Sequence, residues 1–315
     1  MNEINNYLSI CIPTYNRADV LKYNLSRIVP IVRRDNIAIY ISNNASTDDT
    51  VDIVQQFQKE YRYIYIKTNK SNVGYADNFK NVLQMSKSKF SWLLGDDDTI
   101  TNDSCSRILE YIKEYPNSDF IVLNGNTGSN VNIYENHIFK SRNDVLYHLV
   151  GHLFWMSSLV LSYKFMNNTF FNNISNNKDN AFAHTIALLK GLPLKTNVIW
   201  INDILVKAID ERRSSYDNFK IRYFIRDWYE VADEVKSFYT PSAIKRLLND
   251  SPLSMRYLVW LRMRKQLNYK SFIELWRYIA KYPYGILYVS FAFICLMIPS
   301  GGLSKIKRMK DVLIR

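Results

Sequence analysis

The chain has 315 residues and a mass of 37.2 kDa, a length that ordinarily corresponds to about two domains. Hydrophobic residues make up 47% and charged residues 22%, which excludes a disordered or collagen-like protein and allows a sizeable core. The net charge of +12 is concentrated at one end, because residues 254–315 hold twelve Lys and Arg against two acidic residues, a net +10. A near-neutral body with a basic end indicates an anionic partner surface, either a membrane or a nucleic acid.

The cysteine content and the first residues of the chain indicate its cellular compartment. Cys11, Cys105 and Cys295 are an odd number and lie far apart in sequence, which favours a reducing compartment over a disulfide framework. The chain begins MNEINN, polar and acidic where a secretory signal peptide is basic and then apolar. We therefore expect a cytoplasmic location.

The first 125 residues alternate short apolar runs with helix-like stretches. Strands are predicted at 8–12, 37–41, 63–66, 91–94 and 120–123, and helices at 18–34, 49–60, 75–87 and 103–115. Ser46 lies at capping-box spacing from Asp49, which predicts an N-cap near Ser46. This alternation predicts an α/β fold with a mostly parallel sheet and helices on its faces. Ligands of such sheets bind at the carboxyl ends of the strands, so the loops at 13–17, 42–48, 67–74 and 95–99 are expected to line one crevice.

The pattern is less regular after residue 125. Three Asn pairs, at 167–168, 172–173 and 176–177, predict an irregular loop. Further strands are predicted at 157–161 and 204–209, and helices at 181–190, 217–238, 242–249 and 254–281. We therefore divide the chain into a domain at 1–215, with halves 1–125 and 126–215, and a helical region at 216–315.

An apolar run at 286–298 lies within the basic end. As a helix of ~1.5 Å per residue it would be about 20 Å long, shorter than the ~30 Å hydrocarbon core of a bilayer. Flanking tyrosines and a basic cluster at 305–310 are typical of an interfacial segment. We expect 282–310 to associate with a membrane surface; the alternative is a buried core helix.

Three neighbouring carboxylates carry the strongest chemical signal. Asp96, Asp97 and Asp98 directly follow an apolar strand, and such carboxylates repel one another unless a cation neutralises them. Mg²⁺ and Mn²⁺ prefer oxygen ligands, and Mg²⁺ is commonly shared between carboxylates and a substrate's phosphates. The alternative is a solvated turn whose aspartates cap a helix.

Three other segments also place polar residues after predicted strands: SICIPTYNR at 9–17, ISNNASTD at 41–48 and NVGYADN at 72–78. Together with the three aspartates, they resemble the family 2 glycosyltransferases of GT-A fold over about residues 7–123. The resemblance implies a Rossmann-like nucleotide-sugar-binding domain with a mixed, mainly parallel sheet. It also implies a nucleotide-sugar donor, a divalent Mn²⁺ or Mg²⁺ ion and transfer to a hydroxyl acceptor.

The resemblance also implies roles for particular residues. Metal binding falls to Asp96, Asp97 and Asp98. Donor binding falls to Pro13, Thr14, Tyr15, Arg17, Asn43, Asn44, Asn72, Gly74, Asn78 and Asp96. The chain departs from the family at Asn43, which replaces a common Asp, and at Gly95, where many members have the first Asp of the metal motif. The metal pair is therefore either Asp96 with Asp98 or centred on Asp97.

The acceptor hydroxyl needs a group that takes its proton. In the family this base is often the Asp of a Glu-Asp pair that opens a helix, and Asp179 matches it, with Lys178 in place of Glu. His184 is a rival base or an acceptor contact, and the structural alternative for Asp179 is a helix cap. Arg212 and Arg213 are interpreted as part of a loop that covers the diphosphate, or as a solvated charge pair.

Other functions are disfavoured by the motifs. His148 and His152 are spaced for zinc but no third ligand is near, so helix packing is the preferred interpretation. The sequence contains no Gly-x-Gly-x-x-Gly, no P-loop, no His-Glu-x-x-His and no Cys-x-x-Cys, which argues against a NAD oxidoreductase, a P-loop ATPase and a zinc peptidase.

We predict a metal-dependent, inverting glycosyltransferase on the cytoplasmic face of the plasma membrane. It adds one sugar to a polyprenyl-diphosphate-linked saccharide in bacterial O-antigen or capsule assembly, as the resemblance implies. Two alternatives stay open: a catalytically degenerate GT-A scaffold, and nucleic-acid binding by the Tyr, Trp and Arg residues of the basic helices. A nucleic-acid partner is not expected, because amphipathic membrane helices use the same residue types.

Overall fold

The computed structural model describes residues 4–125, 133, 135–208, 226–251, 262, 267–280 and 285–297. The chain divides into two compact units, Met1–Ser215 with Val235–Arg246, and Tyr216–Glu234 with Leu247–Arg315. The domain boundary at 215 stays a prediction, because residues 209–225 lie outside the described part of the chain.

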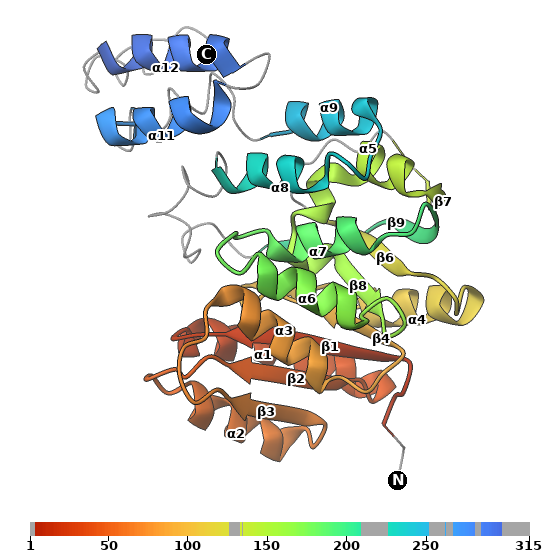
Figure 1. Ribbon diagram of the computed structural model, residues 1–315. Coiled ribbons are helices and arrows are strands. Elements are labelled where there is room, and N and C mark those ends of the chain that lie inside the picture. Colours follow the sequence, from red (N-terminus) through yellow and green to blue (C-terminus); the bar gives the residue numbers. More distant parts are fainter. Residues whose placement is uncertain are drawn as a thin grey trace, which may run out of the picture. The chain divides into compact units, whose positions relative to one another are not determined.

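The described strands of the first unit form one nine-stranded sheet in the order β3-β2-β1-β4-β8-β6-β9-β5, with β7 beside β9 (Figure 1). The strands are β1 Leu8–Thr14, β2 Ala38–Asn43, β3 Ile64–Thr68, β4 Phe90–Leu93, β5 Asp98–Ile100, β6 Phe120–Gly125, β7 His137–Ser141, β8 Leu159–Ser162 and β9 Lys195–Ala208. Strands β1 to β4 run parallel, whereas β8 runs antiparallel to both β4 and β6. The predicted mixed α/β sheet is therefore confirmed.

Helices cover both faces of this sheet (Figure 1). They are α1 Ala18–Val32, α2 Thr50–Glu60, α3 Tyr75–Met85, α4 Ser104–Glu114, α5 Arg142–Leu153, α6 Asn168–Asn176 and α7 Ala183–Gly191, with 3₁₀ turns η1 Arg33–Asp35 and η2 Met156–Ser158. Because side chains alternate along a strand, Ile10 and Ile12 pack in the core formed with α1, α2 and α4. Cys11, between them, is buried on the other face, over which Figure 1 shows α3 and α6.

Two local predictions are wrong. The Asn-rich stretch forms helix α6, because Asn167 accepts a hydrogen bond from the Phe170 amide at 3.0 Å and Phe170 and Ile174, four residues apart, are both buried. Helix α2 begins at Thr50 after Asp49 rather than at a Ser46 cap. The Ser46 hydroxyl instead accepts a hydrogen bond from the backbone of the first loop.

The last described helices are α8 Trp228–Val235, α9 Pro241–Asn249, α11 Tyr269–Ile279 and α12 Gly285–Met297. In the second unit α11 packs against α12, with the rings of Phe272 and Phe293 5.8 Å apart. The apolar run thus forms α12, and residues 281–284 and 298–315 lie outside the described residues. None of the described helices is both long and apolar enough to cross a lipid bilayer.

Candidate active site

Polar side chains gather at one edge of the sheet, where β1, β2, β3 and β4 all end. Strand β8 runs the opposite way and therefore begins at this edge, so the residues just before it also reach the site. Asp96 and Asp97 lie in the turn between β4 and β5, and Asp98 is the first residue of β5. These residues therefore meet at the carboxyl ends of the parallel strands, the edge at which the sequence predicted a crevice.

Asp96 and Asp97 are joined by one guanidinium group. Arg17 Nη1 lies 2.6 Å from Asp96 Oδ1, and Arg17 Nη2 lies 3.0 Å from Asp97 Oδ2. The other oxygen of Asp96 accepts a hydrogen bond from Thr14 Oγ1 at 2.7 Å. Burial raises the pKa of Asp96 to about 6, because desolvation outweighs the attraction of Arg17. The first strand–helix loop and the acidic turn therefore form one charged cluster.

Asp98 points to a different set of partners. Its Oδ2 accepts a hydrogen bond from Trp155 Nε1 at 2.9 Å and another from the Ser157 hydroxyl. Its backbone carbonyl accepts a hydrogen bond from Asn24 Nδ2 at 2.6 Å. Burial, and then the charge of Asp97, raise the pKa of Asp98 to about 7. Asp98 is thus held by hydrogen bonds from neutral groups.

Gly95 and Gly125 leave the space that this arrangement needs. A Cβ at Gly95 would lie 2.9 Å from Asp98 Oδ2 and 3.1 Å from Asp97 Oδ1. A Cβ at Gly125 would lie 2.1 Å from the Trp155 ring, well inside van der Waals contact. A side chain at position 95 would therefore collide with the carboxylates of Asp97 and Asp98.

The carboxylates fit a hard divalent cation as a pair rather than as a triad. Among the residues that the structure describes, no group of three His, Cys, Asp or Glu side chains is arranged to hold a metal ion. Asp96 and Asp97 face the same guanidinium, whereas Asp98 is turned to Trp155. Two carboxylates completed by substrate phosphates form a usual Mg²⁺ site. A role for Asp98 in metal binding stays a prediction.

A network of amide side chains connects the ends of β1, β2 and β3. Asn78 Nδ2 donates to the Ser42 carbonyl at 3.1 Å, and its Oδ1 accepts from Ser42 Oγ at 2.7 Å. Asn44 Nδ2 donates to Asn72 Oδ1 at 2.8 Å and to the Gly74 carbonyl at 3.2 Å. The structure thus brings together Asn44, Asn72, Gly74 and Asn78, which the sequence singled out. Asn43 is fully buried, and its Oδ1 accepts from the Ser46 amide at 3.0 Å.

The first loop is tied to the second by its backbone. Asn16 adopts a left-handed conformation, with φ of 51°, and its amide donates to Ser46 Oγ at 2.9 Å. The Ala18 amide donates to Asp48 Oδ2 at 2.9 Å. Desolvation raises the pKa of Asp48, but hydrogen bonds from Thr50 and from Ala18 outweigh it, so the pKa is lowered overall. Asp48 therefore joins the beginnings of α1 and α2.

The two candidate bases differ in exposure. Asp179 is exposed in the turn before α7, and the buried Asn180 accepts the Phe182 amide at 2.8 Å. His184 is 3% exposed, with its ring centroid 5.9 Å from that of Phe79. Burial lowers the pKa of His184 to about 4. Of these two side chains, Asp179 is exposed and His184 is buried.

The remaining site residues considered from the sequence either pack elsewhere in the fold or lie outside the described residues. His152 is buried against Trp200 and hydrogen-bonded to Asn124 at 3.3 Å, and His148 stacks on Phe139, so both pack in the fold as expected. Arg212 and Arg213 lie outside the described residues.

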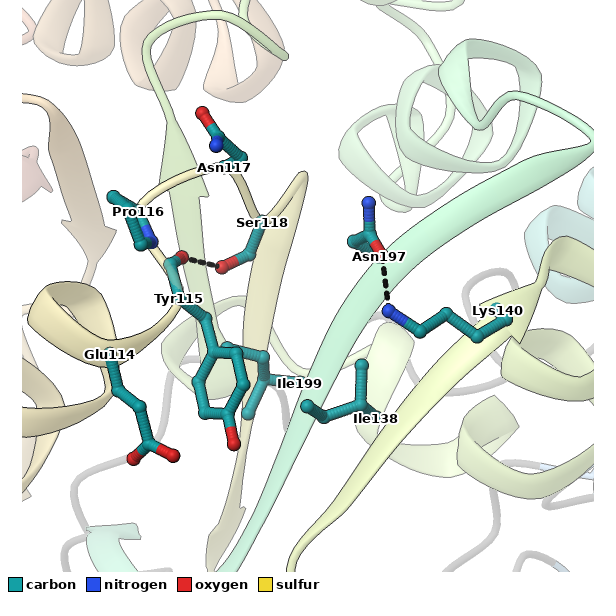
Figure 2. A pocket seen from close by; sticks show the side chains of 9 residues that line it. All are labelled: Glu114, Tyr115, Pro116, Asn117, Ser118, Ile138, Lys140, Asn197 and Ile199. Carbon is teal, nitrogen blue, oxygen red and sulfur yellow. Dashed lines mark hydrogen bonds between the residues drawn. The ribbon is translucent and has the colours of Figure 1, made fainter.

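A cavity of about 220 Å³ opens elsewhere, at the beginnings of β6 and β9 (Figure 2). Four of its lining residues form two hydrogen bonds: Lys140 Nζ donates to Asn197 Oδ1 at 2.6 Å, and the Ser118 hydroxyl donates to the Tyr115 carbonyl. Because β6 runs in the same direction as β4, this cavity lies at the sheet edge opposite the acidic turn. It is lined by Glu114, Tyr115, Pro116, Asn117, Ser118, Ile138, Lys140, Asn197 and Ile199.

The family assignment follows from the stretch that builds the acidic turn and its loops. Residues 9–182 match the family model described as Glycosyl transferase family 2, which is more than half of the chain. This chain belongs to glycosyl transferase family 2. The match spans Arg17, Asp96 to Asp98, Trp155 and Asp179 and ends two residues before His184.

Two curated bacterial proteins are similar to this family 2 member over part of their length. The abequosyltransferase RfbV of Salmonella typhimurium is 33% identical over 107 residues, which cover 33% of this chain and 32% of that protein. The GalNAc(5)-diNAcBac-PP-undecaprenol beta-1,3-glucosyltransferase of Campylobacter jejuni is 30% identical over 108 residues, covering 34% and 35%. The alignments thus span about a third of each relative.

Solved structures share the fold of this family 2 member. Residues 1–349 of S. aureus TarS, in complex with UDP-GlcNAc, superpose with a TM-score of 0.58 at 13% identity, covering 92% of this chain and 90% of that one. The mannosyltransferase PcManGT of Pyrobaculum calidifontis, in complex with GDP-Man and Mn²⁺, gives a TM-score of 0.54 at 12% identity, covering 93% and 87%. The GT-A fold expected from the sequence is confirmed.

Proposed function

We propose that this chain transfers a single sugar from a nucleotide-sugar donor to a hydroxyl of a polyprenyl-diphosphate-linked saccharide, with inversion, in the assembly of a bacterial surface polysaccharide such as O-antigen or capsule. Family membership supports the glycosyl-transfer reaction. The name of the Campylobacter relative supports the lipid-linked acceptor, and the nucleotide-sugar complexes of the structural neighbours support the donor class.

The observation that carries the proposal is the Asp96–Asp97 pair at the tip of β4, facing the loop that follows β1. These two carboxylates would hold the divalent Mn²⁺ or Mg²⁺ ion. When bound, the cation would stabilise the charge that develops on the departing nucleoside diphosphate. A Mn²⁺ ion in the complex of a structural neighbour supports this assignment.

The loops beside the carboxylates would receive the donor. Asn44 and Asn78 fix the loops after β2 and β3 by hydrogen bonds. Tyr15, the first residue after β1, is 41% exposed. Exposed Asn72 and Gly74 are candidates for direct contact with the nucleotide. Pro13 and Thr14 are buried at the end of β1 and would set the position of Tyr15.

Asp179 would remove the proton from the acceptor hydroxyl. It is exposed in the turn before α7, where an acceptor hydroxyl could approach its carboxylate. His184 is buried, and its lowered pKa leaves it neutral at physiological pH. We therefore assign the base to Asp179 and a packing role to His184.

The basic end would bring the enzyme to the cytoplasmic face of the membrane. In α12, Leu287, Ile294 and Met297 are 57%, 55% and 72% exposed, and residues 254–315 carry a net +10. An exposed apolar helix face within a cationic segment favours an anionic lipid surface. An acceptor carried on a polyprenyl chain would be presented at the same surface.

The proposal is tested by turnover of a panel of UDP-, GDP-, CDP- and dTDP-sugars in the presence of Mn²⁺. We expect release of one nucleoside diphosphate, stimulated by a polyprenyl-diphosphate saccharide. Asp97→Asn should lower the rate by about 10²-fold or more, since loss of one charge-stabilising group has this effect in other enzymes. Asp52→Asn, an exposed replacement in α2, should retain the rate. A scaffold without activity would give no metal-dependent turnover with any donor.

A further inference from the structure

Arg17 places a positive group in contact with both proposed metal ligands. Its two terminal nitrogens contact different carboxylates, at 2.6 Å to Asp96 and 3.0 Å to Asp97. The side chains of Arg17, Asp96 and Asp97 are 18%, 7% and 22% exposed. Because the site is largely shielded from water, a positive group between neighbouring carboxylates is strongly favoured there.

Both oxygens of Asp96 are already engaged. Oδ1 accepts from Arg17 and Oδ2 accepts from Thr14 Oγ1 at 2.7 Å. Each oxygen still has a second lone pair, but a divalent cation close to Asp96 would lie beside the Arg17 guanidinium and be repelled by its charge. A cation that displaces Arg17 supplies the positive charge that the carboxylates would otherwise lose. The Thr14 hydroxyl is neutral, so its displacement would not remove the competing charge.

The backbone around Arg17 is fixed, which confines any exchange to its side chain. The Asn16 amide donates to Ser46 Oγ at 2.9 Å, and Asn16 Oδ1 accepts from the Thr47 amide at 2.8 Å. On the other side, the Ala18 amide donates to Asp48 Oδ2 at 2.9 Å. The guanidinium can thus leave the carboxylates by a change of side-chain rotamer, without rebuilding the loop.

We infer that Arg17 is a built-in counter-cation that competes with the divalent ion for Asp96 and Asp97. The inference rests on the proposed function, since it takes these two residues as the metal ligands. Its consequence is ordered binding: the chain alone holds the metal weakly, and a nucleoside diphosphate strengthens metal binding by adding phosphate oxygens as ligands. The displaced guanidinium is then available to the same phosphates, for which its planar donors are suited.

The test measures binding of Mn²⁺ to the full chain from the paramagnetic resonance signal of free Mn²⁺, at pH 8 and without nucleotide. Arg17→Gln should bind Mn²⁺ at least about tenfold more tightly than the unmodified chain, because an adjacent arginine shifts carboxylate equilibria by about one to three decades. Arg27→Gln removes the same charge from helix α1 at a position over the Tyr23 ring. The Mn²⁺ affinity of Arg27→Gln should stay within about twofold of that of the unmodified chain. This control separates direct competition by Arg17 from a general effect of the lost charge.

Arg17→Lys keeps the charge but cannot contact two carboxylates with one planar group, so its Mn²⁺ affinity should fall between those of the unmodified chain and Arg17→Gln. Thermal unfolding of each variant, with and without Mn²⁺, shows whether it is folded and whether the metal stabilises it. If Mn²⁺ binds in the presence of UDP, GDP, CDP or dTDP but neither Arg17 variant binds free Mn²⁺ more tightly, the inference is overturned and the proposed function stands. If Mn²⁺ binds under none of these conditions, both are overturned.

Discussion

At the scale of single residues, the site separates carboxylates with different surroundings. Arg17 pairs with Asp96 and Asp97, neutral donors hold Asp98, and Asp179 is exposed in another turn. Identical side chains can therefore take different roles, because their neighbours set their charge and their access to a substrate. The assignment of the base depends on the same reasoning.

We predict that Asp179→Asn lowers the rate of sugar transfer by about 10²- to 10⁴-fold, the usual contribution of a positioned base. Donor affinity should be unchanged, because the carboxylate is assigned to the acceptor step. Steady-state kinetics with nucleotide release, together with donor titration, check both parts. His184→Phe should retain transfer. The opposite pattern, with activity lost in folded His184→Phe and kept in Asp179→Asn, would reverse the two assignments.

At the scale of elements, the end of β6 and the turn before β8 position Asp98 together. Gly125 closes β6 and leaves room for the Trp155 ring, which donates to Asp98 at 2.9 Å. Ser157 donates to the same carboxylate and accepts a hydrogen bond from the Gly95 amide at 2.8 Å. A substitution at the end of β6 that moves the Trp155 ring would therefore also disturb the hydrogen bond from Trp155 to Asp98.

We predict that Gly125→Ala lowers the free energy of unfolding by about 1–3 kcal/mol, the usual effect of overpacking, because the new methyl group would lie 2.1 Å from the Trp155 ring. Transfer should also fall as Trp155 leaves Asp98. Urea unfolding followed by fluorescence measures the first effect. Gly191→Ala is the matched control, since the atom nearest to its Cβ would be one of the Phe165 ring at 3.3 Å, in a helix that favours alanine. Equal stability of both variants would contradict the prediction.

The sequence predicted the parallel part of the sheet well, because each strand there is a short apolar run closed by polar residues. It also predicted the positions of Arg17 and the three aspartates, which follow such runs. It missed Trp155 and Ser157, because the direction of β8 depends on its pairing with β4 and β6 rather than on its own composition. It also missed α6, where burial of Phe170 and Ile174 overrides the weak helix preference of asparagine.

At the scale of the whole molecule, charge and apolar surface coincide in the second unit. Helix α12 buries Val289, Ala292 and Cys295 and exposes Leu287 and Met297. It carries no charged residue, although the surrounding segment 254–315 is strongly basic. Such a helix can rest at a lipid surface without crossing it, because cationic neighbours meet the headgroups while the apolar face contacts the acyl chains.

We predict that the full chain co-sediments with vesicles containing phosphatidylglycerol and less with vesicles of phosphatidylcholine alone. Binding should weaken in high salt, because screening reduces the attraction of the basic segment. Ile294→Ser with Met297→Ser should weaken it as well, since both side chains are exposed. Leu194→Ser, a change at a residue that is 64% exposed in the first unit, should not. Equal binding to both vesicle types would contradict an electrostatic contribution, and preferential retention of RNA would favour the nucleic-acid alternative.

The asparagine network at the ends of β2 and β3 has a consequence for how the enzyme would respond to its surroundings. Amide groups neither gain nor lose protons across the range in which proteins stay folded. Acidification would therefore protonate Asp96, whose pKa is about 6. It would leave unchanged the loops that Asn44 and Asn78 hold by hydrogen bonds. Under the proposed function, a fall in intracellular pH would weaken binding of the donor's diphosphate through protonation of Asp96, before it affects the loops assigned to the nucleoside.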